Sequence, residues 1–150
     1  MVEDTFGRQV VALARTWIGT PYLHQASCRG AGADCLGLVR GVWREVYGDE
    51  PEAVPPYTAD WSEIGGEERL LLAAGRHLEP LPFKMALPGD VLVLRMRDAG
   101  PAKHLGILAA DDQGFRSLIH AYSGRGVVES PLTQAWLRRV AGSFRFPRRP

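Results

Sequence analysis

The order of helical and strand patterns along the chain limits the fold more than any other feature of the sequence. Up to about residue 75, apolar residues recur at helical spacing, and from Asp90 onward short apolar runs are separated by turn residues. Consecutive strands joined by short turns pair antiparallel, and helices kept apart from them in sequence pack on one face or end of the sheet. We therefore expect an α+β fold with an antiparallel sheet.

Three helices are expected in the first half of the chain. The first covers about residues 5–18, capped by Asp4 or Thr5, and the second covers residues 35–47 with Asp34 as its N-cap. The third begins at Ser62 and ends at Gly75. Strands are expected at residues 91–94, 105–110, 116–122, 127–128 and 140–146, with a short helical turn at 133–137.

Length and charge narrow the possible functions. The 150 residues, of which 45% are hydrophobic, suit one domain spanning residues 1–150. The formal net charge of +1 provides no general attraction to nucleic acid, and no apolar run is long enough to span a membrane. The N-terminus lacks the basic and apolar segments of a secretory signal, so we expect synthesis in the cytoplasm without a signal peptide.

Cys35 stands where a loop of small residues meets the second expected helix. The N-terminus of a helix offers unpaired backbone N–H groups and the positive end of the helix dipole, and both favour a thiolate. We therefore expect Cys35 to be a nucleophile, with its own N–H group as an oxyanion donor. Two cysteines are too few for a disulfide framework. Cys28 could form one bridge with Cys35 in an oxidising compartment, but the lack of a signal peptide favours two free thiols.

A metal site built from the cysteines and histidines is a weaker alternative. The gap of six residues between Cys28 and Cys35 is wider than in typical zinc loops, and the histidines have no short ligand spacing. We expect no metal and no cofactor.

Two of the four histidines, His104 and His120, fall on neighbouring expected strands, and the loop between them decides whether their rings share a face. A five-residue loop that pairs Ala109 with Phe115 places the two histidines directly opposite each other. A four-residue loop puts them on opposite faces. Gly114 suits the left-handed position of an odd-length, bulged loop, so we expect the first register.

The same-face register gives Cys35 the partners that a cysteine nucleophile needs. Cys35 would attack a carbonyl carbon, and His104 would take the thiol proton and return it to the leaving group. His120 would orient His104 and stabilise its charged form. Two half-buried histidines beside an inert thiol remain the alternative.

Five segments of the chain resemble, in order, the NlpC-type cell-wall peptidases, which are papain-like cysteine hydrolases of bacteria and their phages. The segments are residues 14–22 (ARTWIGTPY), 34–39 (DCLGLV), 87–91 (LPGDV), 103–107 (KHLGI) and 119–121 (IHA). The resemblance implies a papain-like NlpC-type fold, with the nucleophile at a helix N-terminus packed on the sheet. By position it implies Cys35 as nucleophile, His104 as base and His120 as the orienting residue.

Two further residues and one departure follow from the same resemblance. Tyr22 matches a family tyrosine whose hydroxyl lies near the nucleophile and shapes the oxyanion site, although it also fits a core aromatic beside the first helix. Asp34 matches a common family acid, which we interpret chiefly as the helix cap. Leu36 replaces the serine that many members have after the nucleophile, so a contact to the substrate or its surroundings differs.

The resemblance also implies a substrate and a setting. The substrate would be the peptidoglycan stem peptide, cleaved beside a D-glutamyl residue. Residues 19–43 look most like the phage-borne branch, which also occurs in gene-transfer particles. The chain has no room for a wall-binding module, so a phage-tail partner would carry it to the periplasm or cell wall. Alternatives are an amidase acting at the sugar–peptide junction, an acyltransferase, or a structural tail component with a vestigial site.

Overall fold

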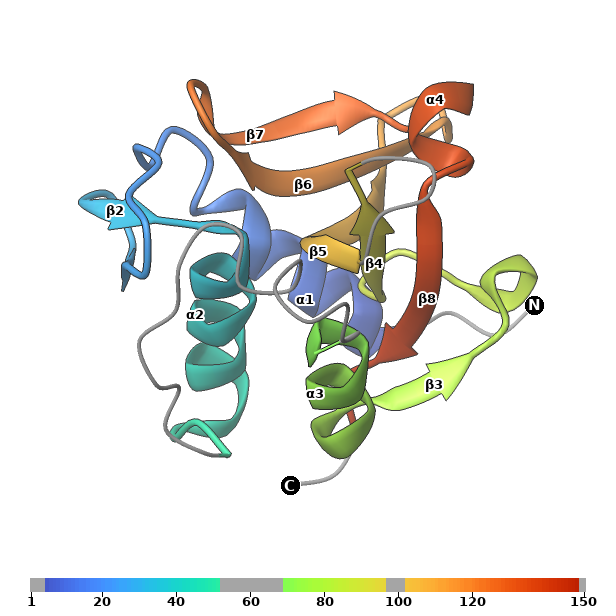
Figure 1. The fold of residues 1–150 in the computed structure, drawn as a ribbon, viewed down its shortest axis with the longest axis horizontal. Helices are drawn as coiled ribbons and strands as arrows, with labels where there is room; N and C mark the ends of the chain where they lie inside the picture. The colour runs from blue at the N-terminus through green and yellow to red at the C-terminus, as the bar shows by residue number, and fades with distance from the viewer. Residues whose placement is uncertain (1–4, 52–68, 97–101, 149–150) are drawn as a thin grey trace.

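The computed structural model describes residues 5–51, 69–96 and 102–148, and its main element is a six-stranded antiparallel sheet (Figure 1). The strand order is β3-β8-β4-β5-β6-β7, and a separate hairpin pairs β1 with β2. The strands are β1 Ser27–Cys28, β2 Gly32–Ala33, β3 Glu79–Leu81, β4 Val91–Arg95, β5 Ala102–Ala110, β6 Arg116–Tyr122, β7 Gly126–Pro131 and β8 Val140–Arg145. The helices are α1 Thr5–Arg15, α2 Cys35–Tyr47, α3 Arg69–His77 and α4 Gln134–Leu137, with a 3-10 turn, η2, at Phe83–Met85.

The three longer helices cover one face of the sheet and so form the larger core. Side chains of α1, α2 and α3 pack there on alternate residues of the central strands, among them Val10, Leu38, Leu70, Val93 and Ile107. The other face carries a smaller apolar cluster of Leu92, Leu94, Leu108 and Leu118, against which Trp136 packs. The expected α+β fold with an antiparallel sheet is confirmed.

The first two helices differ in how closely they follow the sequence pattern. Helix α1 ends at Arg15 rather than near residue 18, because the next three residues bond to carbonyls three positions back and tighten the chain before Gly19, whose φ is 94°. Helix α2 has the predicted bounds. Its predicted N-cap is also confirmed, since the Asp34 side chain accepts a hydrogen bond from the Gly37 N–H.

Helix α3 and strand β3, an edge strand of the six-stranded sheet, differ from the sequence prediction. The expected helix start at Ser62 lies outside the described residues. The helix runs through Gly75 to His77, because Gly75 keeps a negative φ and so does not end it. Strand β3 is absent from the sequence expectation because it contains Pro80, yet it lies at the sheet edge and pairs only with β8, where a proline is tolerated.

The β5–β6 hairpin has the expected parity but a different register. Ala110 pairs with Arg116 and Ala109 with Ser117, so the predicted pairing of Ala109 with Phe115 is wrong by two positions. The cause lies in the loop, where Asp111 accepts hydrogen bonds from two loop N–H groups and holds Phe115 out of the strand. A shift by two keeps side chains on the same face, so the histidines lie diagonal to each other instead of directly opposite.

The segment 87–91 connects the start of β4 to β8 and to helix α1. The buried Asp90 accepts two hydrogen bonds from Arg145 of β8, at 2.9 and 2.8 Å, and one from the Leu87 N–H at 2.8 Å. Gly89 lies against α1 so closely that a Cβ atom there would be 2.6 Å from the Gly7 Cα atom. Asp90 is therefore a structural residue, which holds β4 to β8.

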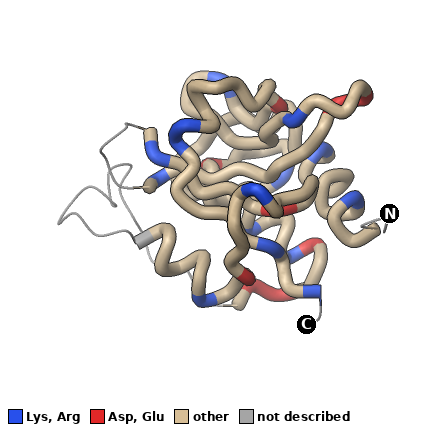
Figure 2. The backbone as a smooth tube through the Cα atoms, turned by 90° about the vertical axis from the view of Figure 1, so that its right-hand side faces the viewer, with Lys and Arg blue, Asp and Glu red and all other residues tan. Residues whose placement is uncertain are grey.

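Charged residues of both signs are spread over the described elements, as the view in Figure 2 shows. This arrangement fits the formal net charge of +1. None of the described helices has the length and apolar character needed to cross a membrane.

Candidate active site

Cys35 is the first residue of α2, and its sulfur meets the backbone of β5. The thiol donates a weak hydrogen bond to the Lys103 carbonyl oxygen at 3.9 Å, and the Leu105 N–H also interacts with the sulfur. These two residues flank His104 in the chain. The structure thus places the predicted nucleophile against the strand segment that carries the predicted base.

Burial at Cys35 acts against the thiolate that the helix N-terminus favours. Burial raises the pKa of the Cys35 thiol to about 12, and the negative charge of Asp34 acts in the same direction. The N–H groups of Leu105, Leu36 and Cys35 itself lower the pKa but do not compensate. Desolvation of the charged sulfur therefore outweighs the helix N-terminus, and Cys35 rests as a thiol that needs a base.

His104 and His120 form a buried pair. Nε2 of His104 lies 2.7 Å from Nδ1 of His120, and the ring centroids are 5.0 Å apart. The second nitrogen of His120, Nε2, lies 3.1 Å from the Ser130 hydroxyl on β7. The same-face prediction is confirmed, and the contact with His120 uses Nε2 of His104 and not Nδ1.

Both histidines rest in the neutral form. Burial lowers the pKa of His104 to about 3, with a further contribution from the charge of His120, and burial lowers the pKa of His120 to about 4. A neutral imidazole can accept a proton, whereas an imidazolium cannot. The resting site is therefore a neutral thiol beside a neutral base.

Aromatic residues that sequence reasoning missed enclose the histidine pair. The Trp136 ring of α4 stacks on His104 at a centroid distance of 5.7 Å and 25° between planes, and meets His120 edge-on at 5.3 Å. Tyr122 lies 5.6 Å from His120. These rings pack on the buried pair, and the stacked Trp136 ring would present a π face to an imidazolium at His104. The one available signal was Trp136 within the expected turn at 133–137.

The structure brings Tyr22, Asp34 and His24 to the same end of α2. The pKa of Tyr22 is raised by burial and then by the charges of Cys35 and Asp34, so its hydroxyl is within electrostatic reach of the thiol. Asp34 is buried and accepts hydrogen bonds from the Gly37 and Gln25 N–H groups, both at 2.7 Å. His24 lies 3.8 Å from the Asp34 carboxylate.

Close packing at Gly37 explains the Asp-Cys-x-Gly spacing. A Cβ atom at Gly37 would lie 1.8 Å from the Ala26 carbonyl oxygen, so only glycine lets the loop before Cys35 pack on the first turn of α2. The Ser27 hydroxyl donates to the Gly37 carbonyl at 2.6 Å, which holds the same loop from the other side. Glycine and aspartate therefore position the thiol together.

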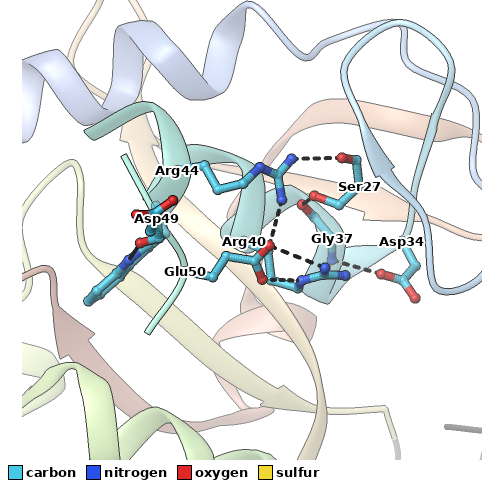
Figure 3. A network of polar contacts seen from close by, with 8 residues as sticks. Ser27, Asp34, Gly37, Arg40, Arg44, Asp49 and Glu50 are labelled. Atoms are coloured by element: carbon cyan, nitrogen blue, oxygen red, sulfur yellow. Dashed lines mark hydrogen bonds and ion pairs between the residues drawn. The ribbon is translucent and has the colours of Figure 1, made fainter. Parts of the chain in front are cut away.

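A network of charged groups continues this anchoring along α2 (Figure 3). Arg44 donates to the Ser27 carbonyl at 2.7 Å and to Glu50 at 3.0 Å, and Arg40 donates to Glu50 at 2.6 Å. Burial alone would raise the pKa of Glu50, but the hydrogen bonds from the two arginines lower it below its ordinary value. The network fixes the loop that ends in Asp34 and Cys35.

The buried histidine pair predicts a loss of stability in acid. Both pKa values lie below the value of about 6.5 in an unfolded chain. Below pH 6.5 the unfolded state therefore binds more protons than the folded state, which favours unfolding. The contribution is intact above pH 6.5 and is lost as the pH falls toward 4. We expect the free energy of unfolding to fall by about 2 to 4 kcal/mol between pH 7 and pH 5, in guanidinium titrations.

The control is a protein carrying His104→Gln and His120→Gln together. Other titrating groups are unchanged in this protein, so its loss between the same pH values should be smaller. Equal losses in the two proteins would contradict the neutral pair.

Residues 5–51, 69–96 and 102–148 contain no group of three His, Cys, Asp or Glu side chains placed to hold a metal ion. Cys28 and Cys35 are both free thiols, as predicted.

The sheet, the helix that begins at a cysteine and the histidine pair define a papain-like α+β fold, and comparison with solved structures shows the NlpC/P60 form of it. NlpC1 from Trichomonas vaginalis matches 97% of this chain with a TM-score of 0.64 and 19% identity, and the chain covers 46% of that protein. The NlpC/p60 domain of the peptidoglycan hydrolase SagA matches 92% of the chain with a TM-score of 0.58 and 22% identity, and 97% of that domain is covered.

A structure of an N-acetylmuramoyl-L-alanine amidase from Bacteroides uniformis also matches, over 97% of this chain and 100% of its own, with a TM-score of 0.60 and 13% identity. The chain spans less than half of the two Trichomonas vaginalis proteins and of a Bacillus cereus NlpC/P60 protein, at 46%, 48% and 40% of their lengths. No protein-family model and no curated protein matches the sequence.

Proposed function

We propose that this chain is a member of the NlpC/P60 family and acts as a cysteine hydrolase on peptidoglycan. One observation carries the proposal: the helix that begins at Cys35 meets β5 at the residues flanking His104, whose other side is held by His120 at 2.7 Å. A thiol, a neutral base and a group that orients the base are the parts of a nucleophilic acyl transfer.

The proposed reaction proceeds through an acyl-enzyme. His104 takes the thiol proton at Nδ1 while the sulfur of Cys35 forms a bond to the amide carbon. The Cys35 N–H and the Tyr22 hydroxyl face the oxyanion. The amide C–N bond then breaks, and the leaving amine receives the proton from His104. Water, deprotonated by His104, hydrolyses the thioester, which releases a carboxylate and restores the thiol.

We propose the stem peptide as the substrate, with cleavage beside a D-glutamyl residue. Support comes from the five sequence segments that resemble NlpC-type peptidases and from the fold shared with the SagA domain, which is described as part of a peptidoglycan hydrolase. Leu36, in place of the serine common in such peptidases, presents an apolar side chain beside the nucleophile.

A second candidate is an amidase that cleaves the bond between muramic acid and the first alanine. It is favoured by the fold shared with structures described as N-acetylmuramoyl-L-alanine amidases from Bacteroides uniformis. The same thiol and histidine pair would serve, since both reactions hydrolyse an amide. An acyltransferase would differ only in the nucleophile that accepts the acyl group.

We further propose that the chain acts as one domain on a phage tail or gene-transfer particle, reaching the periplasm or cell wall with it. The support is the likeness of residues 19–43 to the phage-borne branch. Co-purification with tail proteins after expression beside its neighbouring genes tests this part. Recovery of the chain apart from every particle fraction would contradict it.

Digestion of defined peptidoglycan fragments tests the reaction itself. Purified muropeptides of known sequence are incubated with the protein, and the products are identified by mass spectrometry. We expect a new free amine and carboxylate within the stem peptide, beside the D-glutamyl residue. Release of the whole stem from the sugar would instead establish the amidase. Intact fragments after prolonged digestion would contradict hydrolysis and favour a structural role.

A further inference from the structure

We infer that Ser130 is a positioning residue for the histidine pair: its hydroxyl accepts a hydrogen bond from His120 and thereby stabilises the proton that His104 takes from Cys35. This inference rests on the proposed function in one respect, the exchange of a proton between Cys35 and His104. Neither the sequence pattern nor the resemblance singled out Ser130.

The geometry forms a continuous row of polar atoms. The Ser130 hydroxyl lies 3.1 Å from Nε2 of His120, and Nδ1 of the same ring lies 2.7 Å from Nε2 of His104. His120 is buried, with an exposed fraction of 1%, and Ser130 is half-buried beside it. Strand register fixes the row, because Ser130 pairs with Leu118 on β6 and Val128 pairs with His120.

Counting protons shows which state of the pair needs Ser130 as an acceptor. In the resting pair two protons occupy four ring nitrogens, and a hydroxyl can serve either as donor or as acceptor. After proton transfer the pair holds three protons, of which one lies between the two rings. The other two must then sit on Nδ1 of His104 and Nε2 of His120, so the hydroxyl can only accept. Ser130 therefore stabilises the charged pair more than the resting pair.

Other charged and titratable groups lie on the elements around the histidine pair, and all of them are present in every protein that the test compares. Beside Ser130 on β7, Glu129 binds Arg15 and the Ser117 hydroxyl. Lys103 on β5 is next to His104 in the chain, Tyr122 on β6 contacts both rings, and α4 is followed by Arg138 and Arg139. Asp34 and the thiol of Cys35 lie at the start of α2. The hydroxyl of Ser130 is the group that the structure places at Nε2 of His120.

The test measures the alkylation of Cys35 by iodoacetamide as a function of pH, because this reaction reports the thiolate and needs no substrate. All proteins carry Cys28→Ser, so that Cys35 alone is labelled. With Ser130→Ala we expect the rate at pH 7 to fall by roughly 10- to 100-fold, the value of a hydrogen bond to a charged group. The difference should shrink as the pH rises above 7, because hydroxide increasingly removes the thiol proton without the histidines.

Two variants distinguish a role of the Ser130 hydroxyl in positioning His120 from a general effect of the substitution on the sheet. Ser130→Thr keeps the hydroxyl and should restore most of the rate at pH 7. Ser117→Ala removes a hydroxyl from the same sheet, one that donates to Glu129 at 2.7 Å, and should leave the pH profile unchanged. Denaturation curves show whether each protein is folded.

An unchanged profile with Ser130→Ala, or an equal loss with Ser130→Thr, would overturn the inference. The outcome is independent of the substrate. If peptidoglycan is not cleaved while alkylation behaves as described, the proposed function fails and the role of Ser130 stands.

Discussion

Replacement of Cys35 by alanine is expected to lower peptidoglycan hydrolysis by roughly 10⁴-fold or more, to the background of the assay. The reason is chemical, because no other described thiol or hydroxyl is held at the start of α2 against the backbone that flanks His104. The fold should survive, since the change removes one half-buried sulfur atom and keeps the Asp34 cap. Release of soluble fragments from purified sacculi measures the activity, and guanidinium denaturation measures the stability.

The matched control is Cys28→Ser, which removes the other thiol. Cys28 is exposed on the β1–β2 hairpin, so its replacement should leave both hydrolysis and stability close to those of the parent protein. Full activity of the Cys35→Ala protein would exclude covalent catalysis by this thiol. Equal losses in the two variants would indicate that the hairpin, and not the nucleophile, limits the reaction.

The second large effect is expected at Gly37. In Gly37→Ala the new methyl group would lie 1.8 Å from the Ala26 carbonyl oxygen, a backbone atom that cannot swing aside. The loop before Cys35 must then move off α2, which breaks the hydrogen bond from Ser27 and strains the Asp34 cap. We expect a loss of about 3 kcal/mol in the free energy of unfolding. Hydrolysis should fall as well, because this loop positions the thiol.

A second glycine provides the comparison for this experiment. Gly75 lies in α3 and is exposed, and a Cβ atom added to it would have no neighbouring atom within 4 Å. Gly75→Ala should therefore raise the stability by about 0.5 to 1 kcal/mol, since alanine favours a helix. If Gly37→Ala were as stable as Gly75→Ala, the close approach of the loop to α2 would be refuted.

The α+β fold and the ends of α2 were predictable because they depend on local signals. Apolar spacing defines the helix, Asp34 caps it, and Gly48 ends it with a φ of 99°. Strand positions followed from apolar runs between turn residues. Strand β3 was not predicted, because an edge strand that contains a proline lacks the apolar run that marks the other strands. It forms by pairing with β8.

The register between β5 and β6 could be predicted only in part from the sequence pattern. The parity of the hairpin could be predicted from Gly114, whose φ of 87° suits the bulged loop. The pairing itself depended on Asp111, which gathers the loop N–H groups and adds Phe115 to the loop. A side chain that competes for backbone hydrogen bonds shifts the register by two positions without changing the face.

Local signals in the sequence predicted the α+β class, the placement of Cys35 at a helix start, and the shared face of His104 and His120. These properties are set by neighbours within a few positions or by the alternation of a strand. The protonation states of Cys35, His104 and His120, and the other residues that surround them, depend on contacts between distant parts of the chain. Burial, which depends on the whole fold, raises the pKa of the thiol and lowers that of both histidines. Trp136 and Ser130 reach the pair only because α4 and β7 fold back onto it.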